Sequence, residues 1–132
     1  MIYLIGIPGL IPFYLCFYNI DLIFLDFDKD MFVYYSAVIM SFLGAVYWGV
    51  YLQSKNNIAI LFSVCPAVYA FLVLAFDLKF DETIGFFIAG YFIVLCFDFF
   101  FYFKEKIIKI DYFILRLILT AGIAPAHILY IL

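Results

Sequence analysis

The stretch Met40-Ser-Phe-Leu-Gly-Ala-Val-Tyr-Trp-Gly-Val50 lies inside a long apolar run, and we expect the rest of the chain to be arranged around it. On a helix of about 100° per residue, one face of this region carries four residues, Ala37, Ser41, Gly44 and Trp48. Small residues on one face allow a neighbouring helix to approach closely in lipid. We therefore expect a helix-packing face here, with helix contact rather than chemistry as its role.

The composition is that of an integral membrane protein. Of the 132 residues, 70 % are hydrophobic and 13 % charged, whereas soluble domains have about 45–50 % and about 25 %. The apolar residues form runs close to the ~20 residues that a helix needs to cross a bilayer. Runs without alternation predict helices rather than a closed barrel, the only other structure that pairs every backbone polar group in lipid. A net charge of −3 and no basic cluster argue against nucleic acid as a partner.

Five membrane spans are expected, in a single all-α domain that covers residues 1–132 as a small helical bundle. The predicted helices lie at about 8–25, 31–52, 58–76, 83–103 and 112–132. Pro8 fits the first turn of the first helix, where its missing N–H has no cost. Pro12 predicts either a kink in that helix or a short irregular lead-in from Pro8 to Pro12.

The charges in the loops predict the orientation in the membrane. The second and fourth loops hold most of the basic residues, namely Lys55, Lys104, Lys106 and Lys109. The first and third loops carry only Lys29 and Lys79, among several carboxylates. Because basic short loops stay on the cytoplasmic or matrix side, we expect the N-terminus in and the C-terminus out.

Asp98 and Arg116 are the main ionisable residues at membrane depth. Each is expected roughly 6–8 Å below the same interface, at about 1.5 Å per helical residue, on adjacent antiparallel helices. An unpaired charge at the centre of a bilayer costs at least about 2.5–3.5 kcal/mol, so an intramembrane ion pair is predicted. It is either a structural clamp between helices or a proton or anion site. Tyr91 and Tyr102 share a face of the fourth predicted helix with Asp98. They either form a relay with Asp98 or anchor the helix at the membrane interface.

The fifth predicted helix carries a polar stripe. Thr120 and His127 follow Arg116 on one face, and Pro125 removes the backbone bond to the carbonyl of Ala121. Such a stripe either lines a water-filled cleft or a quinone pocket, or packs against neighbouring helices through its hydroxyl and imidazole.

No catalytic residue, metal site or cofactor is expected, and the chain is not expected to be an enzyme. His127 is the only histidine, so two histidines from this chain cannot ligate a haem. No metal motif, glycine-rich phosphate loop or nucleophile–histidine arrangement occurs in the predicted loops. The cysteines lie in separate apolar runs without CxxC spacing and are expected to be buried small residues: Cys16, Cys65 and Cys96.

Four stretches together resemble the bacterial and mitochondrial membrane family of domain of unknown function 3429, the transmembrane protein 69-like family. They are GLIPF at 9–13, SFLGAVYWG at 41–49, FSVCPAVYAF at 62–71, and the end of the fourth helix with Asp98 followed by LRLILT at 115–120. In the family a histidine usually precedes the tryptophan, and here that position is Tyr47. The resemblance implies a small polytopic inner-membrane protein, mitochondrial or bacterial, with no established activity.

Three classes of function remain open. The first is an accessory or structural subunit, or an assembly factor, of a larger respiratory or other energy-transducing membrane complex, with other membrane subunits and the lipid bilayer as partners. The second is a small oligomeric transporter or channel that uses Asp98, Arg116 and the polar stripe. The third, with least support, is a quinone-binding membrane module. Short loops, faces of small residues and the lack of a catalytic set favour the first class.

Overall fold

The computed structural model describes residues 2–18, 28–76 and 78–132, and all regular structure in these ranges is helical. Three short segments come first: α1 (Ile2–Gly6), the 3₁₀ helix η1 (Ile7–Leu10) and α2 (Ile11–Phe17). Four long helices follow: α3 (Lys29–Ser54), α4 (Asn57–Ala75), α5 (Phe80–Phe103) and α6 (Ile110–Ile131). Each long helix is sufficiently long and apolar to cross a membrane. The prediction of a helical, multi-pass membrane bundle is therefore confirmed.

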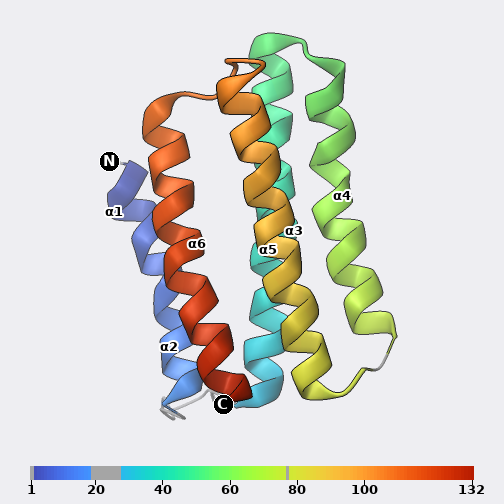
Figure 1. Ribbon diagram of the computed structural model, residues 1–132, viewed down its shortest axis with the longest axis vertical. Coiled ribbons are helices and arrows are strands. Elements are labelled where there is room, and N and C mark those ends of the chain that lie inside the picture. Colours follow the sequence, from blue (N-terminus) through green and yellow to red (C-terminus); the bar gives the residue numbers. More distant parts are fainter. Residues whose placement is uncertain (1, 19–27, 77) are drawn as a thin grey trace.

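The helices stand side by side, and consecutive long helices run antiparallel (Figure 1). The N-terminal segments run along α6 at one edge of the bundle, and α4 forms the opposite edge. The most extensive contact between two helices is that of α3 with α4, followed by that of α5 with α6. The backbones of α3 and α6 do not approach each other closely in the described residues, so side chains fill the space between them.

The first predicted span, at about 8–25, differs from the described structure, which has three short segments instead of one continuous helix. Pro8 and Pro12 lack the N–H groups that a continuous α-helix would use, and the 3₁₀ helix η1 lies between the two short α-helices. The Tyr35 hydroxyl donates to the carbonyl of Gly9 at 2.8 Å and so ties this irregular segment to α3. The helical part begins at Ile2, earlier than predicted. The predicted end lies in residues 19–27, outside the described residues.

The four long helices begin or end a few residues away from their predicted bounds, and polar side chains cap the starts of α3 and α4. The Asp28 carboxylate accepts from the Met31 N–H at 2.9 Å, and α3 therefore begins at Lys29. The Asn56 side chain accepts from the Ile58 N–H at 2.9 Å and starts α4 directly after α3. Between these helices Lys55 adopts the left-handed conformation, with φ 55°, that ends many helices.

Two glycines allow helices to touch. A Cβ at Gly44 would lie 2.5 Å from the backbone oxygen of Ser63, so α3 and α4 meet backbone to backbone there. A Cβ at Gly122 would lie 2.6 Å from a terminal methyl of Leu10, which fixes η1 against α6. Both contacts follow the pattern of small residues at helix crossings in lipid.

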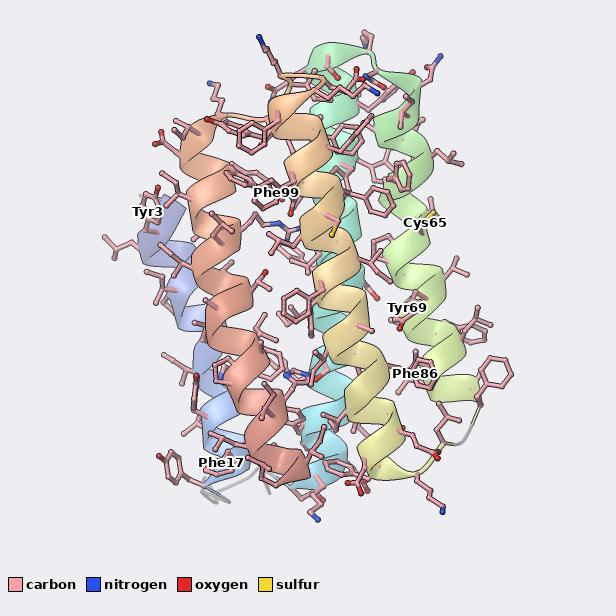
Figure 2. The ribbon with its side chains drawn as sticks, viewed as in Figure 1. Tyr3, Phe17, Cys65, Tyr69, Phe86 and Phe99 are labelled. Carbon is pink, nitrogen blue, oxygen red and sulfur yellow. The ribbon has the colours of Figure 1, made fainter. Side chains whose placement is uncertain are left out.

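The outside of the bundle is apolar. Large hydrophobic side chains are exposed on every long helix, among them Phe42, Phe71, Phe92 and Ile118. Side chains project outward along the whole length of the bundle in Figure 2, where Tyr69 of α4 lies near Phe86 of α5. There the Tyr69 hydroxyl donates to the Phe86 carbonyl at 2.7 Å. A bundle with this surface is suited to contact with a lipid bilayer.

Candidate functional site

A buried cluster of three side chains joins three helices. Tyr47 comes from α3, Asp98 from α5 and Arg116 from α6. The Arg116 Nε donates to Asp98 Oδ2 at 2.8 Å, and the Tyr47 hydroxyl donates to Asp98 Oδ1 at 2.7 Å. Asp98 and Tyr47 are each 1 % exposed and Arg116 is 4 % exposed. The structure thus brings together the two ionisable residues expected to pair and adds a phenol to them.

The positions of Asp98 and Arg116 in their helices explain why they meet. Asp98 lies about five residues before the end of α5 at Phe103, and Arg116 about six after the start of α6 at Ile110. At about 1.5 Å per residue, both lie roughly 8–9 Å from the same end of the bundle. Because α5 and α6 are adjacent and antiparallel, the carboxylate and the guanidinium meet at one level.

Arg116 has more donors than the cluster uses. Its Nη2 is buried without a hydrogen-bond partner among the described residues, and so is the hydroxyl of Tyr112. The Arg116 guanidinium carbon lies 5.5 Å from the centre of the Tyr112 ring, so the two unused donors belong to neighbouring side chains. Buried donors normally find a partner, and this pair therefore needs an explanation.

Both residues line a cavity of about 500 Å³ between the N-terminal segments, α3 and α6. The rest of its wall is almost wholly apolar and includes Ile39, Phe42, Leu43, Val46, Leu115 and Leu119. Gly9 also faces the cavity, and a Cβ there would have no atom within 4 Å. Phe42 is 65 % exposed, so the cavity opens to the outside of the bundle, where lipid would lie.

The predicted polar stripe divides between two environments. Thr120 lines the same cavity as Arg116. His127 is fully buried beside α3, with Nε2 2.9 Å from the Ser36 hydroxyl and Nδ1 donating to the Ile123 carbonyl at 3.0 Å. Three residues before Pro125, the Gly122 carbonyl of α6 accepts a hydrogen bond from the Tyr14 hydroxyl of α2 at 2.9 Å.

The predicted packing face of α3 is only partly buried. Gly44 and Ala37 are buried, and Gly44 contacts α4. Ser41 is half-buried, and its hydroxyl bonds the Ala37 carbonyl of its own helix at 2.9 Å. Trp48 is 48 % exposed, so only part of its surface contacts the other helices of this bundle. It lies about 40° around the helix from Gly44, which takes its large ring past the edge of the α3–α4 contact.

Tyr91 and Tyr102 do not form a relay with Asp98. The Tyr91 hydroxyl donates to the Ser36 carbonyl at 3.0 Å. Tyr102 instead stacks on Phe113, with ring centres 4.6 Å apart. Their shared helix face therefore contributes to packing at separate levels of α5.

Among the described residues, no group of three or more His, Cys, Asp or Glu side chains could hold a metal ion. Cys16 is buried, as expected for a small apolar residue, whereas Cys65 and Cys96 are exposed, so the expectation that they are buried is wrong. Both cysteines lie among exposed apolar side chains, where a small apolar thiol is tolerated.

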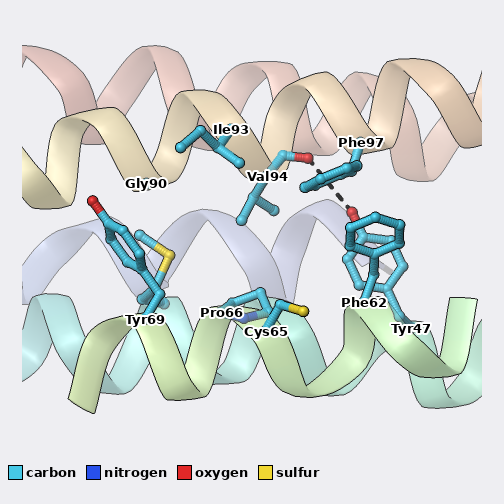
Figure 3. Close-up of a pocket in the computed structure, with 10 residues that line it drawn as sticks. Tyr47, Phe62, Cys65, Pro66, Tyr69, Gly90, Ile93, Val94 and Phe97 are labelled. Carbon is cyan, nitrogen blue, oxygen red and sulfur yellow. Dashed lines mark hydrogen bonds between the residues drawn. The ribbon is translucent and has the colours of Figure 1, made fainter. Parts of the chain in front are cut away.

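A second, smaller cavity of about 120 Å³ lies between α3, α4 and α5. Figure 3 shows Phe62 beside Phe97 there, with ring centres 3.9 Å apart, and the long bond of 3.5 Å from the Tyr47 hydroxyl to the Val94 carbonyl. None of the buried polar atoms without a partner belongs to its lining residues, among those that the structure describes. This cavity therefore offers packing space without a polar anchor.

Sequence reasoning missed two residues of the site. Tyr47 was interpreted only as a departure from the family pattern, although it lies about one turn from Gly44 on the inner side of α3. Tyr112 was used only to mark the start of a helix, yet its spacing of four residues from Arg116 places both on one face. That spacing was the available signal, since an arginine in lipid needs nearby polar groups.

The comparisons with known proteins add one match. A family model described as a protein of unknown function, DUF3429, matches residues 1–132 and so covers the whole chain. No curated protein and no solved structure matches it.

Proposed function

We propose that this chain, which belongs to the DUF3429 family of proteins of unknown function, is a non-catalytic accessory or structural subunit, or an assembly factor, of a larger membrane complex. The proposed setting is a respiratory or other energy-transducing complex of an inner membrane, mitochondrial or bacterial. The partners are other membrane-spanning subunits and the lipid around them.

The observation that carries this proposal is an uncovered face of small residues on α3. Ser41, Ala45 and Gly49 follow one another at intervals of four residues, and Ala45 and Gly49 are exposed. A Cβ at Gly49 would have no atom within 4 Å, so nothing in the described bundle occupies the space beside it. Small residues four apart allow the backbone of a second helix to come close in lipid. The same stretch thus contacts α4 through Gly44 and leaves Ala45 and Gly49 for a helix of another subunit.

The buried pair fits this role as a clamp. Both oxygens of Asp98 already accept hydrogen bonds from side chains of the bundle, Tyr47 and Arg116. A charged pair held from three helices fixes their relative rotation and depth, which a protein that acts by packing requires.

Extraction in mild detergent followed by native mass measurement tests the proposal. We expect the chain to migrate with a large complex and Gly49→Leu to release it, because the leucine fills the uncovered face. Gly85→Leu is the matched control, since a Cβ at Gly85 on α5 also has open space around it. A free monomer or homodimer that moves solute in liposomes would contradict the accessory role.

A second candidate is a small oligomeric transporter that uses Asp98, Arg116 and the polar face of α6. The position of Thr120 and Arg116 on one cavity favours it. Asp98 is 1 % exposed and both of its oxygens accept side-chain hydrogen bonds, so transport through this site would require the surrounding side chains to move. Solute uptake into liposomes by the purified chain, lost in the double variant Asp98→Asn with Arg116→Met at equal amounts of folded protein, would favour this candidate over the accessory role.

The proposed orientation places the basic turns inside and the acidic turns outside, with the N-terminus in and the C-terminus out. In a variant without native cysteines, we expect a cysteine at position 81 to react with a membrane-impermeant maleimide in intact cells or mitoplasts. A cysteine at position 106 should react only after permeabilisation, because Asp81 lies in the first turn of α5 and Lys106 lies just beyond its other end. The reverse pattern of labelling would invert the orientation.

A further inference from the structure

The geometry points to a binding site for a neutral, carbonyl-bearing amphiphile, an isoprenoid quinone, in the cavity between the N-terminal segments, α3 and α6. Its elements are an apolar space of about 500 Å³ and two unused donors, Arg116 Nη2 and the Tyr112 hydroxyl. This inference does not rest on the proposed accessory role, because quinone binding is measured on the purified chain without any partner subunit.

The two donors require an acceptor. Arg116 is 4 % exposed and spends only its Nε on Asp98, while Nη2 has no partner among the described residues. Guanidinium groups and phenols donate hydrogen bonds, so a ligand that satisfies them must carry an acceptor such as a carbonyl oxygen. Leaving a buried donor without a partner is unfavourable, and a ligand that supplies the acceptor removes that penalty.

The charge of the site favours a neutral head group. Asp98 and Arg116 already form a salt bridge with N–O distance 2.8 Å and together carry no net charge. A carboxylate or phosphate would bring an uncompensated negative charge into the membrane, which is costly. A quinone carbonyl accepts the same hydrogen bonds without that charge.

The shape and depth of the site favour a quinone over the ester carbonyl of a phospholipid. Arg116 lies roughly 9 Å along α6 from its first residue, Ile110, at about 1.5 Å per residue. A phospholipid is held at the interface by its polar head, whereas a neutral ring can descend to this level. The apolar wall and its opening beside the exposed Phe42 leave room for the ring and an exit for an isoprenoid tail into lipid.

Binding can be measured on the purified full chain in phosphatidylcholine nanodiscs with a radiolabelled benzoquinone that carries a decyl tail. We expect saturable retention, no comparable retention of decylbenzene, and no competition by decanoate. Equal binding of decylbenzene would mean that the carbonyls are not recognised. Preferential binding of decanoate would make this an anion site and overturn the proposal, as would a tightly held phospholipid that excludes the quinone.

Two variants locate the binding. Tyr112→Phe removes a hydroxyl that has no partner, so the ligand-free protein should keep its stability while quinone binding weakens about fivefold to tenfold, the contribution of one hydrogen bond. Tyr130→Phe is the matched control on α6, because that hydroxyl is also buried without a partner but does not line the cavity. Gly9→Leu should abolish binding by filling open space, whereas Gly85→Leu should not affect it. Unchanged binding in both Tyr112→Phe and Gly9→Leu would overturn the proposal.

Discussion

Asp98→Asn is expected to destabilise the protein by about 3–5 kcal/mol, the cost of removing one partner of a buried ion pair. Arg116 would remain 4 % exposed with its charge uncompensated, and a guanidinium cannot lose its proton in a protein. The Tyr47 hydroxyl would also lose a charged acceptor at 2.7 Å. Thermal unfolding in detergent and the amount of protein in membranes should both fall.

Arg116→Met should have a smaller effect than Asp98→Asn. A carboxyl group can take up a proton and become neutral, and the protonated Asp98 can still accept from Tyr47. The double variant Asp98→Asn with Arg116→Met should recover most of the lost stability, because neither charge is left alone.

The matched control for this series is Asp111→Asn, which removes an exposed carboxylate from the first turn of the same helix as Arg116. It should change stability by no more than about 0.5 kcal/mol. If Asp98→Asn behaved like Asp111→Asn, the pair would contribute little to holding the three helices together.

Gly44→Ala is the second substitution with a large expected effect, although it adds a single methyl group. The new Cβ would lie 2.5 Å from the Ser63 backbone oxygen and 3.1 Å from Pro66 Cδ, so α3 and α4 must separate. Overpacking of this kind typically costs about 1–3 kcal/mol. The value should fall in the upper part of that range because the obstructing atom belongs to backbone. Gly44→Leu should prevent the α3–α4 contact altogether.

Gly49→Ala, on the same helix, separates close packing from backbone effects. A Cβ there has no atom within 4 Å, and alanine favours a helix over glycine by about 0.5–1 kcal/mol. Stability should therefore stay the same or rise slightly when both variants are compared by thermal unfolding in one detergent. Equal losses in the two variants would show that the closeness of α3 to α4 at Gly44 is not a source of stability.

Much of the fold could be predicted because lipid leaves few choices. An apolar run of about 20 residues must pair its own backbone groups, so the positions of four long helices follow from the runs and the loops between them. The first segment could not be predicted in the same way. Pro8 and Pro12 remove backbone donors at two places, and Tyr35 of α3, whose hydroxyl holds the Gly9 carbonyl, is distant in the chain.

The candidate site was predicted in part for the same reason. Asp98 and Arg116 are conspicuous because they lie in apolar runs. Counting residues from the segment that joins α5 to α6 places both side chains at one depth in the bundle. The third member, Tyr47, and the unused donor on Tyr112 depend on how α3 is rotated about its axis. The small-residue pattern alone does not give this rotation, since Ala37 on the same face is buried while Trp48 is 48 % exposed.

That this is a helical membrane protein, roughly where its long helices lie, and that its two intramembrane charges pair can therefore be inferred from the amino-acid sequence. Hydrophobicity identifies the helices, and the cost of an unpaired charge, together with the number of residues from each helix end, predicts the pair. Which side of each helix faces its neighbours depends on how the helices pack. That rotation brings Gly44 against α4, Tyr47 to Asp98, and Arg116 and Tyr112 to a shared cavity, because side chains from separate helices must fill the same space.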